Sequence, residues 1–179
     1  MTVRQPLPRL WLVSDARNDA GLEQALQRLP RGSGFIYRHY HLTSPERRAR
    51  FAELKRIAKA RGHIVVLSGT AHEARRWGAD AAYGDATRLA PGPRLPRLIT
   101  AHSLRELRQV GRADAALLSP VFATRSHPAA QPLGPLRFRR IAAQSIIPVI
   151  ALGGMTPRTA LRLKGFTWAA IDGLIAKDS

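Results

Sequence analysis

The chain has 179 residues, 45% of them apolar, and this length predicts one domain with a sizeable core rather than two. It contains no cysteine, which excludes disulfide bonds, thiolate zinc sites and thiol nucleophiles. No apolar run approaches the roughly 20 residues that span a bilayer. The N-terminus also lacks the apolar segment of a signal peptide. We therefore expect a cytoplasmic protein without a membrane partner.

The net charge of +17 comes almost wholly from arginine, because the only lysines are Lys55, Lys59, Lys164 and Lys177. Such a charge attracts anions of any kind. The arginines are scattered over several predicted helices and form no single stripe with interleaved aromatic residues, which a nucleic-acid-binding surface would show. We interpret most of them as solvated helix faces and rank a nucleic acid partner last among the hypotheses.

Apolar, β-branched runs alternate with amphipathic stretches along the whole chain, which is typical of parallel strands connected by helices. Helices are expected between the strands, with Asp19, Ser44, Thr70, Ser103 and Thr156 as their N-terminal caps. We predict eight strands, at residues 9–14, 34–40, 63–67, 79–83, 97–100, 114–118, 148–152 and 167–172.

Two connections and the end of the chain depart from that regular pattern. The segment 84–96 contains three prolines, so we expect a loop or a single turn there instead of a full helix. Ser119–Leu133 is a long connection before a helix that begins near Gly134. Only seven residues follow Asp172, so the last helix must be a stub.

The predicted strands at residues 65–67, 115–118 and 149–152 are continuously apolar. This pattern is expected when helices cover one face of a sheet and a barrel interior lies behind the other. An open doubly wound sheet would contain similar strands, but eight successive units favour closure. We predict that residues 1–179 form a single, compact (β/α)8 TIM barrel with an irregular fourth unit and a truncated last helix.

In such a barrel, the active site is built from the residues that follow each strand. Here these positions are poor in carboxylates and rich in hydroxyl, glycine and basic residues, which suit an anionic ligand. Gly153–Gly154 precedes a predicted helix, so its N–H groups can approach a phosphate closely, although an ordinary turn would have the same sequence. The candidate substrate- and phosphate-binding residues are Arg38, Tyr40, Thr100, His102, Ser119, Thr124, Ser126, His127, Gly153 and Gly154.

Three segments resemble the thiamine phosphate synthase / TenI family in their order and spacing. They are residues 114–128 (DAALLSPVFATRSHP), 148–155 (PVIALGGM) and 100–103 (TAHS). The resemblance implies a TIM barrel and an enzyme of thiamine biosynthesis. Synthases of this family join a pyrimidine diphosphate to a thiazole phosphate, with magnesium-assisted loss of diphosphate.

Carried over to this sequence, the resemblance implies that Arg38 and the hydroxyls of Thr124 and Ser126 bind the diphosphate. It implies that Gly153–Gly154 binds the thiazole phosphate. His127 stands where the family has a lysine. We take Arg38 and His127 as the catalytic candidates, because the charge of a leaving diphosphate has to be neutralised by positive groups.

The chain departs from the family at other positions. Tyr40 replaces the lysine of the strand-two motif, and Ser68–Gly69 stands where the family has Asn-Asp with a magnesium ligand. The resemblance thus implies magnesium as a cofactor, whereas we assign no metal ligand among the residues present. A divergent relative with an altered substrate stays open, as does a non-catalytic or repurposed barrel that binds a phosphorylated small molecule. A homo-oligomer is also compatible with the sequence.

Overall fold

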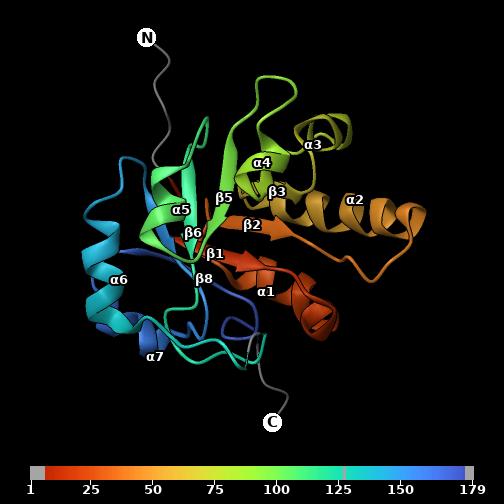
Figure 1. Ribbon diagram of the computed structural model, residues 1–179. Coiled ribbons are helices and arrows are strands. Elements are labelled where there is room, and N and C mark those ends of the chain that lie inside the picture. The colour runs from red at the N-terminus through yellow and green to blue at the C-terminus, as the bar shows by residue number, and fades with distance from the viewer. Residues whose placement is uncertain (1–6, 127, 176–179) are drawn as a thin grey trace.

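The computed structural model describes residues 7–126 and 128–175, and in it eight parallel strands close into one barrel (Figure 1). Each strand pairs with the next along the chain, and the last strand pairs with the first. This confirms the predicted (β/α)8 TIM barrel. The strands are β1 (Leu10–Val13), β2 (Gly34–Tyr37), β3 (Ile64–Ser68), β4 (Ala81–Gly84), β5 (Arg97–Ala101), β6 (Ala115–Leu118), β7 (Val149–Ala151) and β8 (Thr167–Ala170).

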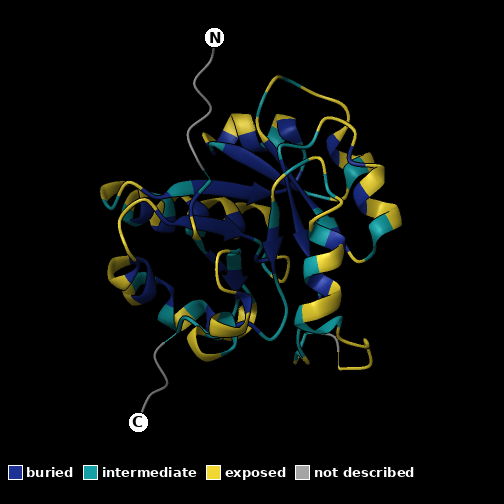
Figure 2. Cartoon of the chain, turned by 90° about the vertical axis from the view of Figure 1, so that its left-hand side faces the viewer, coloured by how far each residue is buried: buried dark blue, intermediate teal, exposed yellow. Residues whose placement is uncertain are grey.

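Helices surround the barrel, and their outward sides are exposed whereas the strands are buried (Figure 2). The fourth unit is irregular, as expected, and no helix follows β8 within the residues described up to 175. None of the described helices is long and apolar enough to cross a membrane. The helices are α1 (Leu22–Arg28), α2 (Ser44–Ala60), α3 (Ala71–Trp77), α4 (Ala86–Leu89), α5 (Leu104–Arg108), α6 (Gly134–Ala142) and α7 (Pro157–Ala160), with 3-10 turns η1 (Ala16–Gly21) and η2 (Leu161–Leu163).

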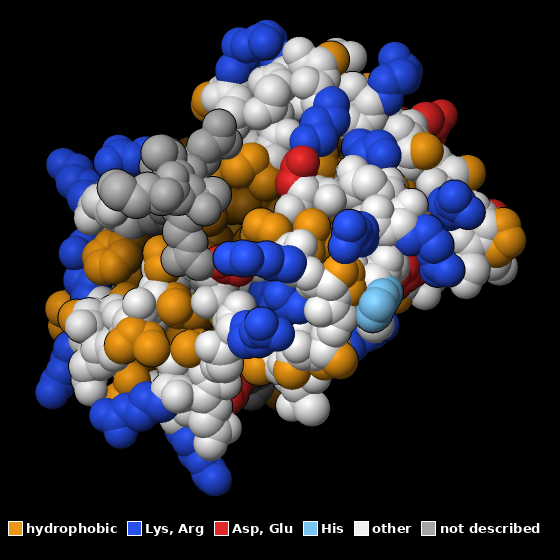
Figure 3. All heavy atoms as spheres, turned by 90° about the horizontal axis from the view of Figure 1, so that it is seen from above, with side chains coloured by type: hydrophobic (Ala, Val, Ile, Leu, Met, Phe, Trp, Pro, Cys, Tyr) orange, Lys and Arg blue, Asp and Glu red, His pale blue; other side chains and the backbone are white. Residues whose placement is uncertain are grey.

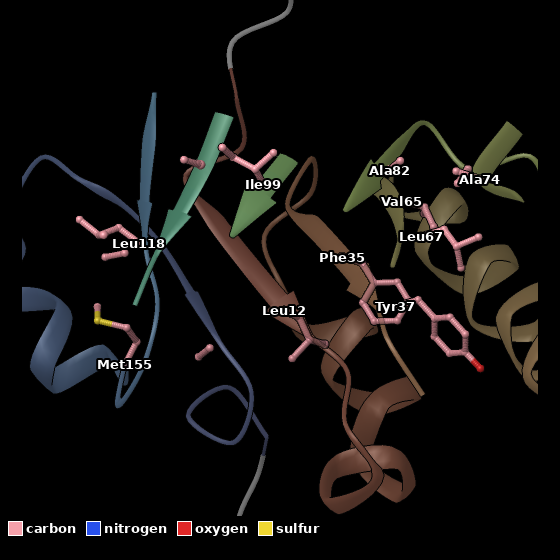
Figure 4. Packing of buried hydrophobic residues seen from close by; sticks show 14 of the residues in the cluster. Leu12, Phe35, Tyr37, Val65, Leu67, Ala74, Ala82, Ile99, Leu118 and Met155 are labelled. Carbon is pink, nitrogen blue, oxygen red and sulfur yellow. The ribbon is translucent and has the colours of Figure 1, made fainter. Parts of the chain in front are cut away.

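Successive residues of each strand face alternately the helices and the inside of the barrel. Leu12 and Phe35 belong to the large apolar cluster between strands and helices, part of which Figure 4 shows. Their neighbours Trp11 and Ile36 belong to a second buried cluster, made of strand residues, which fills the inside of the barrel. The continuous apolar runs of the sequence follow from this arrangement, because both faces of the strands are buried.

The large ring of Trp11 fills part of the barrel interior, and the neighbouring strand makes room for it. The side chain is fully buried, and its indole N–H donates to the carbonyl of Pro8 at 2.8 Å. Gly34 of β2 lies opposite Trp11 of β1. A Cβ atom at Gly34 would lie 2.0 Å from Cε3 of the Trp11 ring, so this position requires glycine.

The irregular segment between α4 and β5 is held by the buried side chain of Arg97. Its guanidinium donates to the carbonyls of Leu89 at 2.6 Å, Leu95 at 2.9 Å and Pro93 at 3.0 Å. Such carbonyls need partners because the prolines here prevent a regular helix. The fourth unit is therefore ordered by one arginine in place of helical hydrogen bonds.

Two predicted helix caps are wrong. Asp19 does not begin the first helix, because Asp15 caps the preceding turn η1 and the carboxylate of Asp19 is used by distant partners described below. Ser44 is the first residue of α2 instead of its cap. The cap is Thr43, whose N–H donates to Glu46 Oε2 at 3.0 Å.

Strand β2 is shorter than predicted. It ends at Tyr37, because His39 has a φ angle of 42°, in the left-handed region that strands do not adopt. The turn takes Tyr40 out of the sheet, where the residue is 56% exposed. The predicted strand residues 38–40 therefore form a turn at the carboxyl end of the barrel.

Replacing Gly34 by alanine should destabilise the barrel by about 3 kcal/mol, because the added methyl group overpacks against Trp11. Gly62→Ala is the matched control. Its φ is 71° and no atom lies within 4 Å of the added Cβ, so only the left-handed backbone contributes. That contribution is about 1 kcal/mol. Urea denaturation measures both losses, and equal losses would contradict the packing role of Trp11.

Candidate functional site

A cavity of about 520 Å³ opens at the carboxyl ends of the strands. One of the ten candidate binding residues, His127, lies outside the described residues. The structure thus brings the other predicted residues to one place, while their individual roles stay predictions. Nine candidates line the cavity: Arg38, Tyr40, Thr100, His102, Ser119, Thr124, Ser126, Gly153 and Gly154.

The alternation of side chains explains why several of these residues face the cavity. Arg38, Thr100 and Ser119 each lie two residues beyond an inward-facing apolar residue, and side chains two positions apart share one face of a strand. The last inward-facing apolar residues are Ile36, Leu98 and Leu117, respectively. The cavity therefore has an apolar floor and a polar rim.

Hydrogen bonds fix the backbone on both sides of Arg38. Its N–H donates to Ser14 Oγ at 2.8 Å, and its carbonyl accepts from Arg47 Nε at 2.8 Å. Arg47 reaches this point from α2, is only 9% exposed, and also donates from Nη2 to the Ser68 carbonyl at 2.5 Å. The ends of β2 and β3 are thus tied to α2, which holds the base of the Arg38 side chain in place.

The buried imidazole of His39 supports the same region. Its Nδ1 lies 2.8 Å from Ser14 Oγ and its Nε2 lies 2.8 Å from Asp19 Oδ1. Burial lowers the pKa of His39, so the neutral ring donates from Nε2 to Asp19 and accepts the Ser14 hydroxyl at Nδ1. The order Ser–His–Asp is that of a hydrolase triad, but Ser14 has no exposed surface. The network therefore positions Arg38 and supplies no nucleophile.

Three arginines line the cavity, after β2, β4 and β6: Arg38, Arg88 and Arg125. The carboxylates along it are Asp85 and Asp172. Arg88 was not among the residues expected at the site, because the segment 84–96 was expected to form a loop or a single turn. Asp85 caps α4 by accepting the N–H of Arg88 at 2.7 Å, which places Arg88 at the rim. A capping aspartate directly after a strand, three residues before an arginine, is the signal that could have located it.

Positive charge is also abundant away from the cavity. On the face shown in Figure 3, the lysine and arginine side chains are spread around the edge and across the middle. They contribute to a general attraction of anions that has no fixed binding geometry. A test of binding in the cavity therefore needs a control arginine from outside it.

His102 is oriented by a backbone carbonyl. Its Nδ1 donates to the carbonyl of Ser119 at 2.9 Å, which fixes the proton of the neutral ring on Nδ1. Nε2 then serves as an acceptor in the neutral ring and as a donor in the protonated ring. On the loop after β6, Thr124 Oγ1 accepts the N–H of Ser126 at 3.3 Å. This contact keeps the two loop hydroxyls close together.

Gly153 and Gly154 form a turn after β7 that the loop after β6 covers closely. Their φ angles are 94° and 62°, which favour glycine. A Cβ at Gly153 would lie 2.7 Å from Pro120 Cα, and one at Gly154 would lie 2.4 Å from the Ala123 carbonyl oxygen. The helix that follows, α7, has only four residues, so the helix dipole expected from the sequence is small. Backbone N–H groups are the donors that this turn offers.

Arg17 was not among the residues expected at the site, but it contacts two residues that line the cavity. Its Nη2 donates to Ser126 Oγ at 2.9 Å and lies 3.7 Å from Asp172 Oδ2. Its Nε lies 3.3 Å from Asp15 Oδ1. Arg17 thus connects the segments that follow β1, β6 and β8. Arg17 lies three residues beyond the predicted end of the first strand, so a search of the residues directly after that strand did not include it.

The residues present do not fit the magnesium ion that the family resemblance implies. The Ser68 hydroxyl is hydrogen-bonded to the Tyr40 hydroxyl, and the Ser68 carbonyl faces the guanidinium of Arg47. Asp85 caps α4, and Asp172 is in an ion pair. The described part of the chain contains no group of three or more His, Cys, Asp or Glu side chains that could hold a metal ion. Mg²⁺ is normally bound through carboxylates in octahedral geometry, whereas this rim offers guanidinium groups.

The comparison with known families classifies the chain. A family model described as thiamine monophosphate synthase matches residues 10–171. The chain belongs to the thiamine monophosphate synthase family.

Solved structures of similar proteins support the fold of this family member. The thiamine phosphate pyrophosphorylase from Pyrococcus furiosus has a TM-score of 0.77 at 22% identity, over 94% of this chain and 88% of that chain. The thiamine phosphate pyrophosphorylase from Bacteroides thetaiotaomicron has a TM-score of 0.61 at 17% identity, over 90% and 81% of the two chains. At these identities the likeness shows the barrel fold alone.

One curated relative matches over a shorter stretch. "Putative thiamine-phosphate synthase 2" of Aquifex aeolicus (strain VF5) is 44% identical over 59 residues. The matched stretch is 32% of this chain and 32% of that protein, so it spans about a third of the relative. The family assignment therefore depends on the family model, which covers most of the chain.

The buried histidines predict how stability changes with pH. Burial lowers the pKa of both His39 and His63 below the ordinary value of 6.5. As the pH falls through this value, the unfolded chain binds protons that the folded chain does not, so the free energy of unfolding decreases. The slope is at most about 1.4 kcal/mol per pH unit for each histidine.

Urea denaturation between about pH 7.5 and pH 5.5 measures this slope. His63→Gln removes one titrating group and retains a donor for the Leu26 carbonyl, which His63 Nε2 contacts at 2.9 Å. This variant should show a smaller slope than the natural chain. A free energy of unfolding that does not change over this pH range would contradict the assignment of neutral, buried histidines.

Proposed function

We propose that this member of the thiamine monophosphate synthase family is a transferase that couples a pyrimidine diphosphate to a thiazole phosphate or a related thiazole, with release of diphosphate. The observation that carries the proposal is the convergence of Arg38, Arg88 and Arg125 on one cavity, together with the hydroxyls of Thr124 and Ser126. Guanidinium groups suit this task because their planar donors match phosphate oxygens in pairs.

The reaction requires charge neutralisation at one end of the cavity. The thiazole nitrogen forms the new C–N bond, while the C–O bond to the diphosphate breaks and its electron pair leaves with the diphosphate. Negative charge therefore grows on the leaving group, and fixed cations that face this position stabilise the transition state. Arg38 is the main candidate for this role, because its backbone is held by Ser14 and Arg47 before any ligand binds.

The other end of the cavity is suited to the second ligand. Gly153 and Gly154 line it and leave their N–H groups free for a ligand, with no acceptor for them among the described residues. The apolar floor of the barrel provides a surface for two heterocyclic rings. We place the pyrimidine diphosphate towards Arg38 and Arg88 and the thiazole towards the glycine turn.

Product formation tests the proposal directly. Purified protein is incubated with the pyrimidine diphosphate and with the thiazole supplied either as its phosphate or as the free alcohol. Released diphosphate and coupled product are measured, with and without a magnesium chelator. We expect released diphosphate and coupled product in equal amounts. No coupled product with either form of the thiazole would refute the transferase.

Removal of one cavity arginine should weaken the binding of diphosphate. Arg38→Gln should lower the affinity for inorganic diphosphate by about tenfold to hundredfold, because charge-assisted hydrogen bonds are lost. Arg48→Gln, on the exposed side of α2, is the matched control, which removes the same charge outside the cavity. Calorimetric titration measures both affinities. Equal losses in the two variants would indicate attraction by the general charge and no site at Arg38.

A second function is a non-catalytic barrel that binds a phosphorylated small molecule. It is favoured by one observation, namely that the described residues contain no cluster of three or more His, Cys, Asp or Glu side chains that could hold a metal ion. This function predicts the same dependence of diphosphate binding on Arg38 but no coupled product. The product assay therefore decides between the two functions.

A further inference from the structure

The loop after β8 places a carboxylate beside the glycine turn of the cavity. Asp172 lines the cavity together with Gly153 and Gly154, and its side chain is 43% exposed. The next residue, Gly173, is packed against the loop after β7, because a Cβ there would lie 2.1 Å from the Met155 carbonyl oxygen. Close backbone packing therefore keeps Asp172 at the end of the cavity that we assign to the thiazole.

Arg17 offsets the charge of Asp172 only in part. Its guanidinium lies 3.7 Å from Asp172 Oδ2 but 3.3 Å from Asp15 Oδ1, and its hydrogen bond goes to Ser126. Within the described ranges, no other cation pairs with Asp172. One guanidinium thus faces two carboxylates, and Arg125 lines the same cavity from the loop after β6.

Other strand ends around the cavity carry positive charge. Arg88 follows β4, which lies across the closed eight-stranded barrel from β8, and Arg38 follows β2, two strands from β8. A diphosphate is attracted to these arginines. A second phosphate beside Asp172 would instead bring two anions together in a partly enclosed space, where charges are screened less than in water. A hydroxyl group would donate a hydrogen bond to the same carboxylate.

We propose that Asp172 is a specificity-determining residue, which selects a second ligand that ends in a hydroxyl group over the same ligand ending in a phosphate. The inference rests on the proposed function, in which the second ligand is a thiazole. The preferred substrate is then the thiazole alcohol, and the coupled product has a free hydroxyl group. The bonds made and broken at the ring nitrogen and at the diphosphate are unchanged.

Calorimetric titration of a matched pair of ligands tests this inference. The protein is first saturated with inorganic diphosphate and is then titrated with the thiazole alcohol or with its phosphate ester. We expect the alcohol to bind at least tenfold more tightly. Asp172→Ser removes the carboxylate and should lower this preference by tenfold or more, whereas Arg17→Gln removes the counter-charge and should increase it.

The controls separate this inference from the proposed function. Failure of inorganic diphosphate to bind would count against the proposed function. If diphosphate binds, the inference alone is overturned by either of two results: a preference for the phosphate ester, or the same preference in Asp172→Ser. Binding of neither thiazole would overturn the inference and also count against the proposed function. Thermal unfolding verifies that each variant is folded. Should Asp172→Ser not fold, Asp172→Asn removes the charge at nearly the same size and takes its place.

Discussion

The two hydrogen bonds that hold the peptide groups of Arg38 are the contacts on which the site depends. The N–H of Arg38 donates to Ser14 Oγ, and the carbonyl of Arg38 accepts from Arg47 Nε, each at 2.8 Å. Ser14 is hydrogen-bonded to His39, and His39 is hydrogen-bonded to Asp19. The Arg38 backbone is therefore supported by the end of β1, by η1 and by α2 together. A charged side chain at the end of a short strand would otherwise move with the turn that follows. Here the backbone that carries the Arg38 guanidinium is held before a ligand arrives, which reduces the reorganisation needed on binding.

The charges around the cavity differ from one strand end to the next. Arginines follow β2, β4 and β6, whereas a carboxylate that is paired with Arg17 follows β8. The positions where the family resemblance implies a magnesium ligand hold Ser68 and Gly69, and a buried guanidinium from Arg47 reaches the same strand end. Arginine side chains thus line the cavity, and the proposed diphosphate site would rely on them. Arg97, although equally buried, serves the loop between α4 and β5 and takes no part in this arrangement.

The sequence was sufficient to predict the barrel and to name nine residues that line one cavity, because both follow from local patterns. Eight apolar strands separated by helices predict closure, and the residues just beyond strands such as β5 and β6 share the inward face of Leu98 and Leu117. Arg88 and Arg17 were missed for a different reason. Each lies in a turn that begins with a capping aspartate, and the caps Asp85 and Asp15 were not recognised as such.

Other features depend on contacts between residues distant in sequence, which no local pattern shows. Asp19 was predicted to cap a helix, but its carboxylate is held by His39 and by Arg50, whose Nε lies 2.9 Å away. These hydrogen bonds outweigh the opposing effect of burial and lower the pKa of Asp19. The left-handed backbone of His39 likewise ended β2 earlier than the apolar pattern predicts.

A crystal structure of the protein with inorganic diphosphate tests the central claim most directly, which is that the arginine side of the cavity holds this anion. The account predicts diphosphate density in contact with the guanidinium groups of Arg38 and Arg88, with Ser14 and Arg47 still bonded to the Arg38 backbone. Density at surface arginines alone, with the cavity free of diphosphate at saturating concentration, would contradict it.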